Sequence, residues 1–153
     1  MSGAIIVGVS VGLHLALGRW VPSPWFMPDL TVTGMVLAIL LLPERPVSPA
    51  ILSGALTMLF SVPHSLAAGV MYPLVGGLVK YAAHQWDLSQ PRRQRAVVVA
   101  AQALLLFLTV PLRTRWTGEL FWLSLVHLSL TALCVPVIRW AIVAWVPAAR
   151  VNS

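Results

Sequence analysis

The side chains that could carry out chemistry are few, and they stand far apart in the sequence. The four acidic residues each lie near the end of an apolar run, and they are Asp29, Glu44, Asp87 and Glu119. Hydrolysis and proton transfer usually need two ionisable groups that converge on one point. The sequence also lacks a Gly-x-Ser-x-Gly motif, a phosphate-binding glycine loop and a His-Glu-x-x-His motif. It therefore predicts a protein that is not an enzyme and has no catalytic residue.

The histidines raise the question of a metal or haem site. No two of them stand three or four residues apart, no Cys-x-x-Cys-His motif is present, and no acid neighbours His14 or His127. These two histidines fall in the middle of apolar runs, where a polar side chain is a functional candidate. We expect neither a metal nor a cofactor, and we interpret both as partners in interhelical hydrogen bonds, for example with Gln102. The single cysteine, Cys134, excludes a disulfide within the chain.

The composition accounts for this scarcity of chemical groups. Of the 153 residues, 59% are hydrophobic and 9% are charged, and the mean hydropathy is +0.88, far outside the range of soluble domains. The sequence predicts an all-α, polytopic integral membrane protein with a single transmembrane domain, residues 1–153. The first apolar run has no basic region before it and no small-residue cleavage site after it. We therefore interpret it as a retained helix rather than a signal peptide.

Hydropathy and helix-breaking residues divide the chain into about six predicted spans. They lie near residues 3–20, 25–42, 48–62, 65–83, 96–112 and 119–146. The second span has an apolar stretch of thirteen residues, which reaches only ~20 Å against ~30 Å of hydrocarbon. It therefore either starts earlier, through Pro28, or does not cross cleanly. Residues 84–95 are the one connection long enough to be a proper loop.

The basic residues predict the orientation of these spans, because cytoplasmic loops carry an excess of Lys and Arg. Both termini in the cytoplasm place six basic residues inside and three outside. The six are Arg45, Lys80, Arg92, Arg93, Arg95 and Arg150, and the three are Arg19, Arg113 and Arg115. A five-span alternative, with the last segment along the membrane surface, stays open. The net charge of +6 then indicates topology and contact with anionic lipids rather than binding of nucleic acid.

The seven tryptophans fall mostly where the ends of the spans are predicted. They are Trp20, Trp25, Trp86, Trp116, Trp122, Trp140 and Trp145. This placement is typical of aromatic anchors at the surface of a membrane, and it gives no sign of a substrate-stacking role.

Small and polar residues recur every four positions in the third and fourth spans. They are Ser53, Thr57 and Ser61, with Ala50 and Gly54 beside them, and then Gly69, Pro73 and Gly77. Such faces allow helices in lipid to approach closely. We expect the two faces to pack against each other or against another membrane protein, and the pattern leaves both possibilities open.

The second span opens with Pro28, Asp29 and Leu30. Proline suits the first helical position because its missing N–H would have no partner there. The Asp29 carboxylate can accept hydrogen bonds from free backbone N–H groups at the positive end of the helix dipole. We expect Asp29 to cap this helix. The alternatives are contact with a partner protein or an ion pair with Arg19 or Arg113.

The order of these features resembles that of the rod-shape-determining membrane protein family MreD, over roughly residues 28–140. The resemblance rests on the Pro-Asp-Leu helix start, the "PERP" turn, the segment "ILSGALTMLFS", the basic loop and the final segment "FWLSLVHLSLTALCVPVIRW". Its most specific pieces are Pro28-Asp29-Leu30, Gly54-Ala55, Phe121-Trp122, Pro136 and Arg139. The family often has an acid a few residues after that glycine, where this chain has Met58.

The resemblance implies a non-catalytic scaffold of the elongasome in the bacterial inner (cytoplasmic) membrane. Such a scaffold binds MreC and supports the cell-wall synthase pair, RodA and a class B penicillin-binding protein, in the maintenance of rod shape. The implied fold is a six-helix bundle similar to the substrate-binding subunits of energy-coupling-factor transporters. Two alternatives stay open, namely a vitamin-type small-molecule-binding subunit of a transporter and an accessory subunit of another membrane complex. A vitamin-binding subunit would need polar residues, chiefly Arg113, Arg115, Glu119 and His64.

Overall fold

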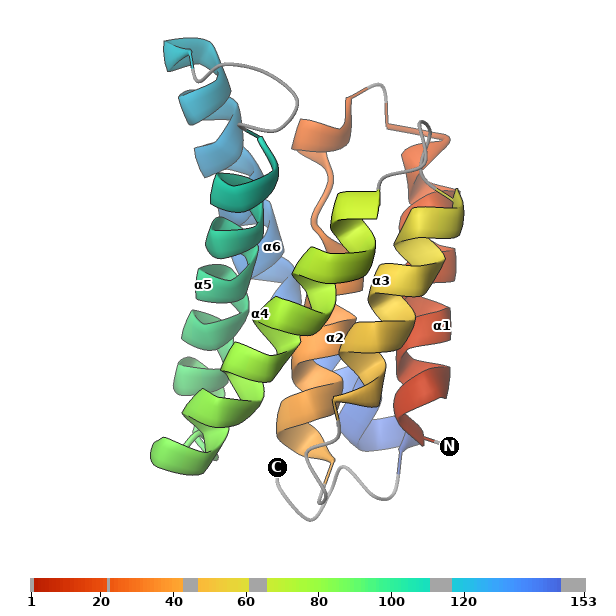
Figure 1. The fold of residues 1–153 in the computed structure, drawn as a ribbon, viewed down its shortest axis with the longest axis vertical. Coiled ribbons are helices and arrows are strands. Elements are labelled where there is room, and N and C mark those ends of the chain that lie inside the picture. Colours follow the sequence, from red (N-terminus) through yellow and green to blue (C-terminus); the bar gives the residue numbers. More distant parts are fainter. Residues whose placement is uncertain (1, 22, 43–46, 61–65, 111–116, 147–153) are drawn as a thin grey trace.

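The computed structural model describes residues 2–21, 23–42, 47–60, 66–110 and 117–146. Within these ranges the chain forms an all-α six-helix bundle (Figure 1). The helices are α1 (Ser2–Gly18), α2 (Leu30–Leu41), α3 (Ser48–Phe60), α4 (Leu66–Gln85), α5 (Pro91–Thr109) and α6 (Gly118–Trp145). A short 3₁₀ helix, η1 (Pro24–Phe26), precedes α2. The predicted all-α class and the predicted order of six helices are confirmed.

Two helices begin at residues other than those predicted. Helix α2 begins at Leu30 rather than near residue 25, because Asp29 is its N-cap and η1 occupies the segment before it. Pro28 therefore precedes the N-cap, and its predicted place at the first helical position is wrong. Helix α5 begins at Pro91 rather than near residue 96, since proline fits the first turn of a helix. The predicted loop at residues 84–95 is thereby reduced to residues 86–90.

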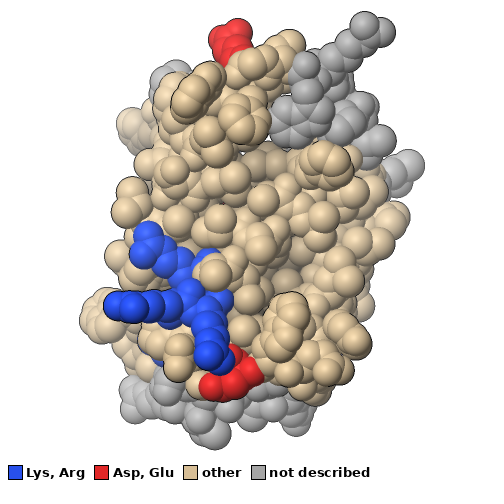
Figure 2. All heavy atoms as spheres, turned by 90° about the vertical axis from the view of Figure 1, so that its left-hand side faces the viewer, with Lys and Arg blue, Asp and Glu red and all other residues tan. Residues whose placement is uncertain are grey.

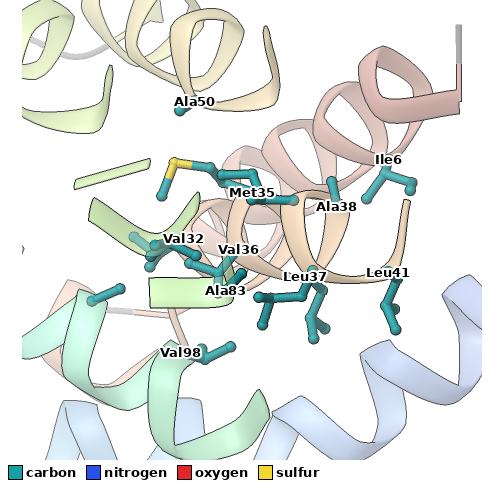
Figure 3. Close-up of a cluster of buried hydrophobic side chains, with 14 of the residues drawn as sticks. Ile6, Val32, Met35, Val36, Leu37, Ala38, Leu41, Ala50, Ala83 and Val98 are labelled. Atoms are coloured by element: carbon teal, nitrogen blue, oxygen red, sulfur yellow. The ribbon is translucent and has the colours of Figure 1, made fainter. Parts of the chain in front are cut away.

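Helix α2 forms the centre of the bundle. All twelve of its residues are buried, and it packs against each of the other five helices. Side chains such as Met35 and Leu37 leave it on different sides (Figure 3). A helix that is apolar all round is expected to be buried on every side, and this one is. Its Thr33 hydroxyl donates a 2.7 Å hydrogen bond to the Asp29 carbonyl oxygen, so that the buried hydroxyl has a partner.

The outer helices carry large apolar side chains on their exposed sides. Examples are Ile5, Val9, Leu13, Ile51, Val70, Leu74, Phe107, Leu133 and Val137. Monomeric proteins in water rarely expose contiguous apolar surface of this kind. Among the described residues, α6 is the one helix that is both long and apolar enough to cross a membrane, while α1, α2 and α3 are apolar but shorter.

The two ends of the bundle differ in charge. The start of α1, the end of α6 and the connection from α4 to α5 lie at the same end (Figure 1). Lys and Arg side chains gather towards that end (Figure 2), where Lys80 lies on α4 and Arg92, Arg93 and Arg95 lie on α5. Glu119 lies at the start of α6, at the opposite end. Among the described residues, four basic side chains thus lie towards the end that carries the start of α1, which is called the basic end.

Candidate functional site

The start of α2 is held by the side chain of Asp29. Its Oδ1 atom accepts a 2.9 Å hydrogen bond from the backbone N–H of Val32, and its backbone has the extended conformation of an N-cap. The capping role predicted for Asp29 is therefore confirmed. Among the described residues, Asp29 makes no ion pair with Arg19, and Arg113 lies outside them. Leu30, the third residue of the predicted motif, is the first residue of the helix and is buried.

The same helix start is fastened to α6 by Thr131. The backbone N–H of Asp29 donates a 3.0 Å hydrogen bond to Thr131 Oγ1, and the Thr131 hydroxyl donates a 2.9 Å bond to the His127 carbonyl oxygen. Thr131 is fully buried, and its hydroxyl both accepts and donates a hydrogen bond, as a buried hydroxyl needs. The contact joins residues 102 positions apart and fixes the central helix against the last one. Nothing in the sequence pattern had singled out Thr131.

His127 lies one turn before Thr131 and pairs with α5. Its Nε2 atom is 2.8 Å from Gln102 Nε2, and both side chains are buried. This hydrogen bond joins α5 to α6 directly through two side chains. The Trp25 ring meets the imidazole edge-on at a centroid distance of 6.1 Å. The predicted hydrogen bond between the fifth and last helices is confirmed for His127.

His14 lies elsewhere, on the side of α1 that faces α2, α3 and α4. It lines a small cavity together with Thr31, Thr57 and Tyr72. Its Nδ1 atom is buried and, among the described residues, has no hydrogen-bond partner. The interhelical hydrogen bond expected for His14 is therefore not made through this atom. The structure thus assigns the two predicted histidines to different surroundings.

A second polar centre, at the basic end, joins α5 to α6 through Gln94. The fully buried Gln94 side chain accepts a 2.7 Å hydrogen bond from Arg139 Nε and donates a 3.0 Å bond to the Leu88 carbonyl oxygen. The connection between α4 and α5 is thereby tied to α6. Gln94 was not predicted as a site residue, because it stands among arginines in a segment whose composition indicated a loop. Arg139, a polar residue inside an apolar span, was the available signal.

The small-residue faces of α3 and α4 meet, but only some of the predicted residues lie in the contact. These two helices form the most extensive pairing in the bundle. The closest approach is between Ala50 and Gly76, where a Cβ atom added to the glycine would overlap the alanine side chain. Gly69 faces Met58, whereas a Cβ atom added at Gly77 would meet open space. Gly76 is thus the glycine that this contact requires.

The other members of the predicted faces have different surroundings. Ser53 and Gly54 are buried on α3, whereas Pro73 is half-buried within α4. Thr57 is hydrogen bonded through its side chain to Tyr72. Ser61 lies outside the described residues. Any role of these positions in binding another protein stays a prediction.

A second close approach, between α1 and α2, was not predicted. A Cβ atom added at Gly34 would overlap the Ser10 side chain, so the central helix needs a glycine at this point. A repeat of small residues every four positions would have indicated this contact, but Gly34 is the one glycine in α2 and so forms no glycine repeat. The contact is a packing feature and brings no reactive group near another.

Side-chain hydrogen bonds fasten α2 to α6 and α5 to α6, whereas others stay within a single helix. Within the described ranges no three His, Cys, Asp or Glu side chains are grouped so that they could hold a metal ion. The carboxylates of Asp29, Asp87 and Glu119 belong to different parts of the fold, namely the start of α2, the connection from α4 to α5 and the start of α6. Comparison with family models, with characterised proteins and with solved structures finds no match to this chain.

Proposed function

We propose that this chain is a multi-pass membrane protein in which all six helices cross or enter the bilayer. The observation that carries the proposal is the distribution of side chains: polar hydrogen-bonded groups lie between the helices, and large apolar side chains cover the outside. Lipid accepts an apolar surface and penalises unpaired polar groups, so this arrangement suits a bilayer. Helix α2 spans only ~18 Å with its twelve residues, which is tolerable because the other helices surround it.

The basic end of the bundle sets the orientation within this proposal. Lys80, Arg92, Arg93 and Arg95 lie towards the end that carries the start of α1 and the end of α6. Basic residues are retained on the cytoplasmic side. Both termini are therefore cytoplasmic, and Arg19 and Glu119 lie on the outer side.

We further propose that the protein is a non-catalytic scaffold of the MreD type, which holds MreC and supports RodA and its class B penicillin-binding protein. Two features support this role. The Pro28-Asp29-Leu30 motif that carries the resemblance is the capped start of the central helix, and its polar atoms bind other parts of the same chain. The buried polar pairs likewise join helices to one another.

The proposal is tested by affinity purification from the native membrane in a mild detergent. The expected result is recovery of the chain together with an MreC-type protein and the synthase pair, from the membrane fraction. Recovery of a folded monomer that carries a vitamin and no protein partner would overturn the scaffold role. Reporter fusions at the C-terminus test the topology separately, because an extracytoplasmic signal contradicts the six-span arrangement.

A further inference from the structure

An apolar groove lies between α1 and α6. Both helices pack against α2, but α1 packs otherwise against α3 and α6 against α5, so the two are not closely packed on each other. Buried residues of three helices form the floor of the groove, namely Ile6, Ser10, Leu30 and Ile142. Its rims are exposed and include Val9 on α1 and Val137 on α6. The groove therefore opens on the outside of the bundle.

The groove begins at the basic end and extends towards the middle of the bundle. The start of α1 and the end of α6 lie together at the basic end (Figure 1). The lining extends from Ile5 to Leu13 on α1 and from Val137 to Trp145 on α6, which is ~12 Å along each helix axis. Leu30 lies at the deep end, because α2 runs antiparallel to α1 and begins there.

The groove is too narrow for another helix. Its volume is about 570 Å³, so a length of ~12 Å gives a mean cross-section of ~50 Å². An α-helix with its side chains is ~10–12 Å across, which corresponds to a cross-section of ~80–110 Å². A transmembrane helix of another protein or of a second copy could therefore insert side chains into the groove but could not lie within it.

Hydrocarbon chains match the groove in both volume and length. A cavity of roughly 150 Å³ holds the six-carbon ring of benzene, so about 570 Å³ holds about 20 carbon atoms. An extended chain advances ~1.2 Å per bond, so about ten carbon atoms cover the ~12 Å of length. Two extended chains side by side therefore fill the groove, whereas one fills about half of it.

The chemistry of the lining also favours hydrocarbon. Among the described residues, the groove is lined by no charged side chain, and its polar side-chain groups are the Ser10 hydroxyl and the Trp145 indole N–H. Ser10 is 8% exposed and packs against Gly34, while Trp145 lies at the mouth and is 83% exposed. A polar ligand would lose its hydration in the groove without gaining hydrogen bonds in return.

We propose that this groove binds the two acyl chains of one membrane phospholipid. The head group lies at the basic end beside Trp145, and the first carbons of each chain, about ten, extend inwards to Leu30. Because the lining carries no charge, the number of chains determines binding and the charge of the head group does not. The proposal rests on the membrane location proposed above. Such a lipid contacts two helices and the floor between them, whereas a lipid outside the groove contacts one outer face.

The test is native mass spectrometry of the purified full chain in detergent. Three lipids are offered in equal amounts: phosphatidylglycerol and phosphatidylethanolamine, each with two palmitoyl chains, and lysophosphatidylglycerol with one. We expect the two diacyl lipids to be retained to a similar degree and the single-chain lipid about tenfold less. A diazirine placed about ten carbons from the head group should label Leu13 or Leu30, at the deep end of the groove.

Two pairs of variants locate the bound lipid. Ala141→Trp fills the groove from α6 and should lower the retention of both diacyl lipids about tenfold. Ala100→Trp, on an exposed face of α5, is the matched control and should retain the lipids as the wild type does. Val9→Trp fills the groove from α1 and should act like Ala141→Trp, and Val70→Trp on α4 is its control. Circular dichroism melting curves establish that each variant is folded.

The outcomes separate the possibilities. Equal retention of diacyl and single-chain lipids by the wild type, or equal losses from Ala141→Trp and Ala100→Trp, would overturn the proposal. Recovery of a dimer that retains no lipid and that Ala141→Trp separates into monomers would also contradict it, and would assign the groove to a second copy. A negative lipid result alongside intact recovery of an MreC-type protein rejects this site and leaves the scaffold proposal standing.

Discussion

Helices α5 and α6 are joined by two side-chain hydrogen bonds, one in the interior of the bundle and one nearer its basic end, and the two bonds differ in kind. Gln102 and His127 form a neutral pair that is buried on both sides. Gln94 and Arg139 form a charged pair in which the glutamine is fully buried and the arginine is half-buried. The Gln94 amide also holds the Leu88 carbonyl, so it connects three segments where Gln102 connects two helices.

This difference shows where the helical bundle accommodates charge. A neutral pair can lie deep among apolar residues at a lower desolvation cost than a charged group, although the buried Gln102 Oε1 atom has no hydrogen-bond partner among the described residues. A guanidinium placed at the same depth would need water or a counterion. Arg139 lies near the basic end, where its remaining donors can reach solvent while Nε binds the buried amide.

The largest effect is expected from Gln94→Leu. This change removes the acceptor for Arg139 and the donor to Leu88, and it leaves a charged donor without a partner beside an apolar side chain. We expect a loss of about 3 kcal/mol in the free energy of unfolding, measured by denaturant titration in detergent micelles. The double variant Gln94→Leu with Arg139→Met should recover part of it. Equal stability of Gln94→Leu and wild type would show that the basic end is not held by this side chain.

The next effect concerns the Asp29 side chain, at the start of α2. Asp29→Ala removes the acceptor for the Val32 N–H, and Val32 is fully buried, so no water replaces the carboxylate. We expect a loss of about 2 kcal/mol, the upper end of the range for N-caps, whereas Asp29→Asn should cost only a few tenths because asparagine also caps. The same unfolding titrations give the comparison. Loss of partner binding by Asp29→Asn at normal stability would instead assign Asp29 to an interface.

These two sites show what the sequence could and could not predict. The cap at Asp29 was predictable because it depends on local chemistry, a carboxylate beside free N–H groups at the start of an apolar run. The role of Gln94 depends on Arg139, 45 residues away, and on a helix that begins at Pro91. The charges around Gln94 indicated a loop. Charged residues indicate that a segment is exposed to solvent, but they do not show whether its backbone is helical.

The positions of the helices were largely predictable. An apolar run must form a helix to pair its backbone groups, and residues such as proline mark where the helix ends. The mutual packing of the helices was less predictable. The four-residue spacing correctly indicated that α3 and α4 are built for close approach, yet the register selected Gly76 instead of Gly77 against Ala50. Adjacent residues on a helix differ by ~100° in direction, so a pattern that fits one glycine almost fits the next.

A smaller effect is expected when the neutral pair is broken. Gln102→Leu removes the hydrogen bond to His127 Nε2 but leaves no charge stranded, and leucine fills a similar space. We expect a loss of about 1 kcal/mol, in the range measured for hydrogen bonds between helices in membranes. Double-mutant cycles with His127→Leu isolate the coupling between the two side chains. A loss as large as that of Gln94→Leu would contradict the distinction between the neutral pair and the charged pair.

The smallest effect is expected at the exposed ion pair of the basic end. Arg93 Nη1 is 3.6 Å from Asp87 Oδ2, and both side chains are more than half exposed. Water and salt screen such a pair, and the ordering of two mobile side chains offsets much of the attraction, so Arg93→Gln should change stability by less than about 0.5 kcal/mol. The 2.7 Å bond from the same nitrogen to the Asp87 carbonyl can be replaced by water. Stability measured at low and high salt is the check, and a loss near that of Gln94→Leu would mean that charge at this end, rather than the buried amide, holds α5 in place.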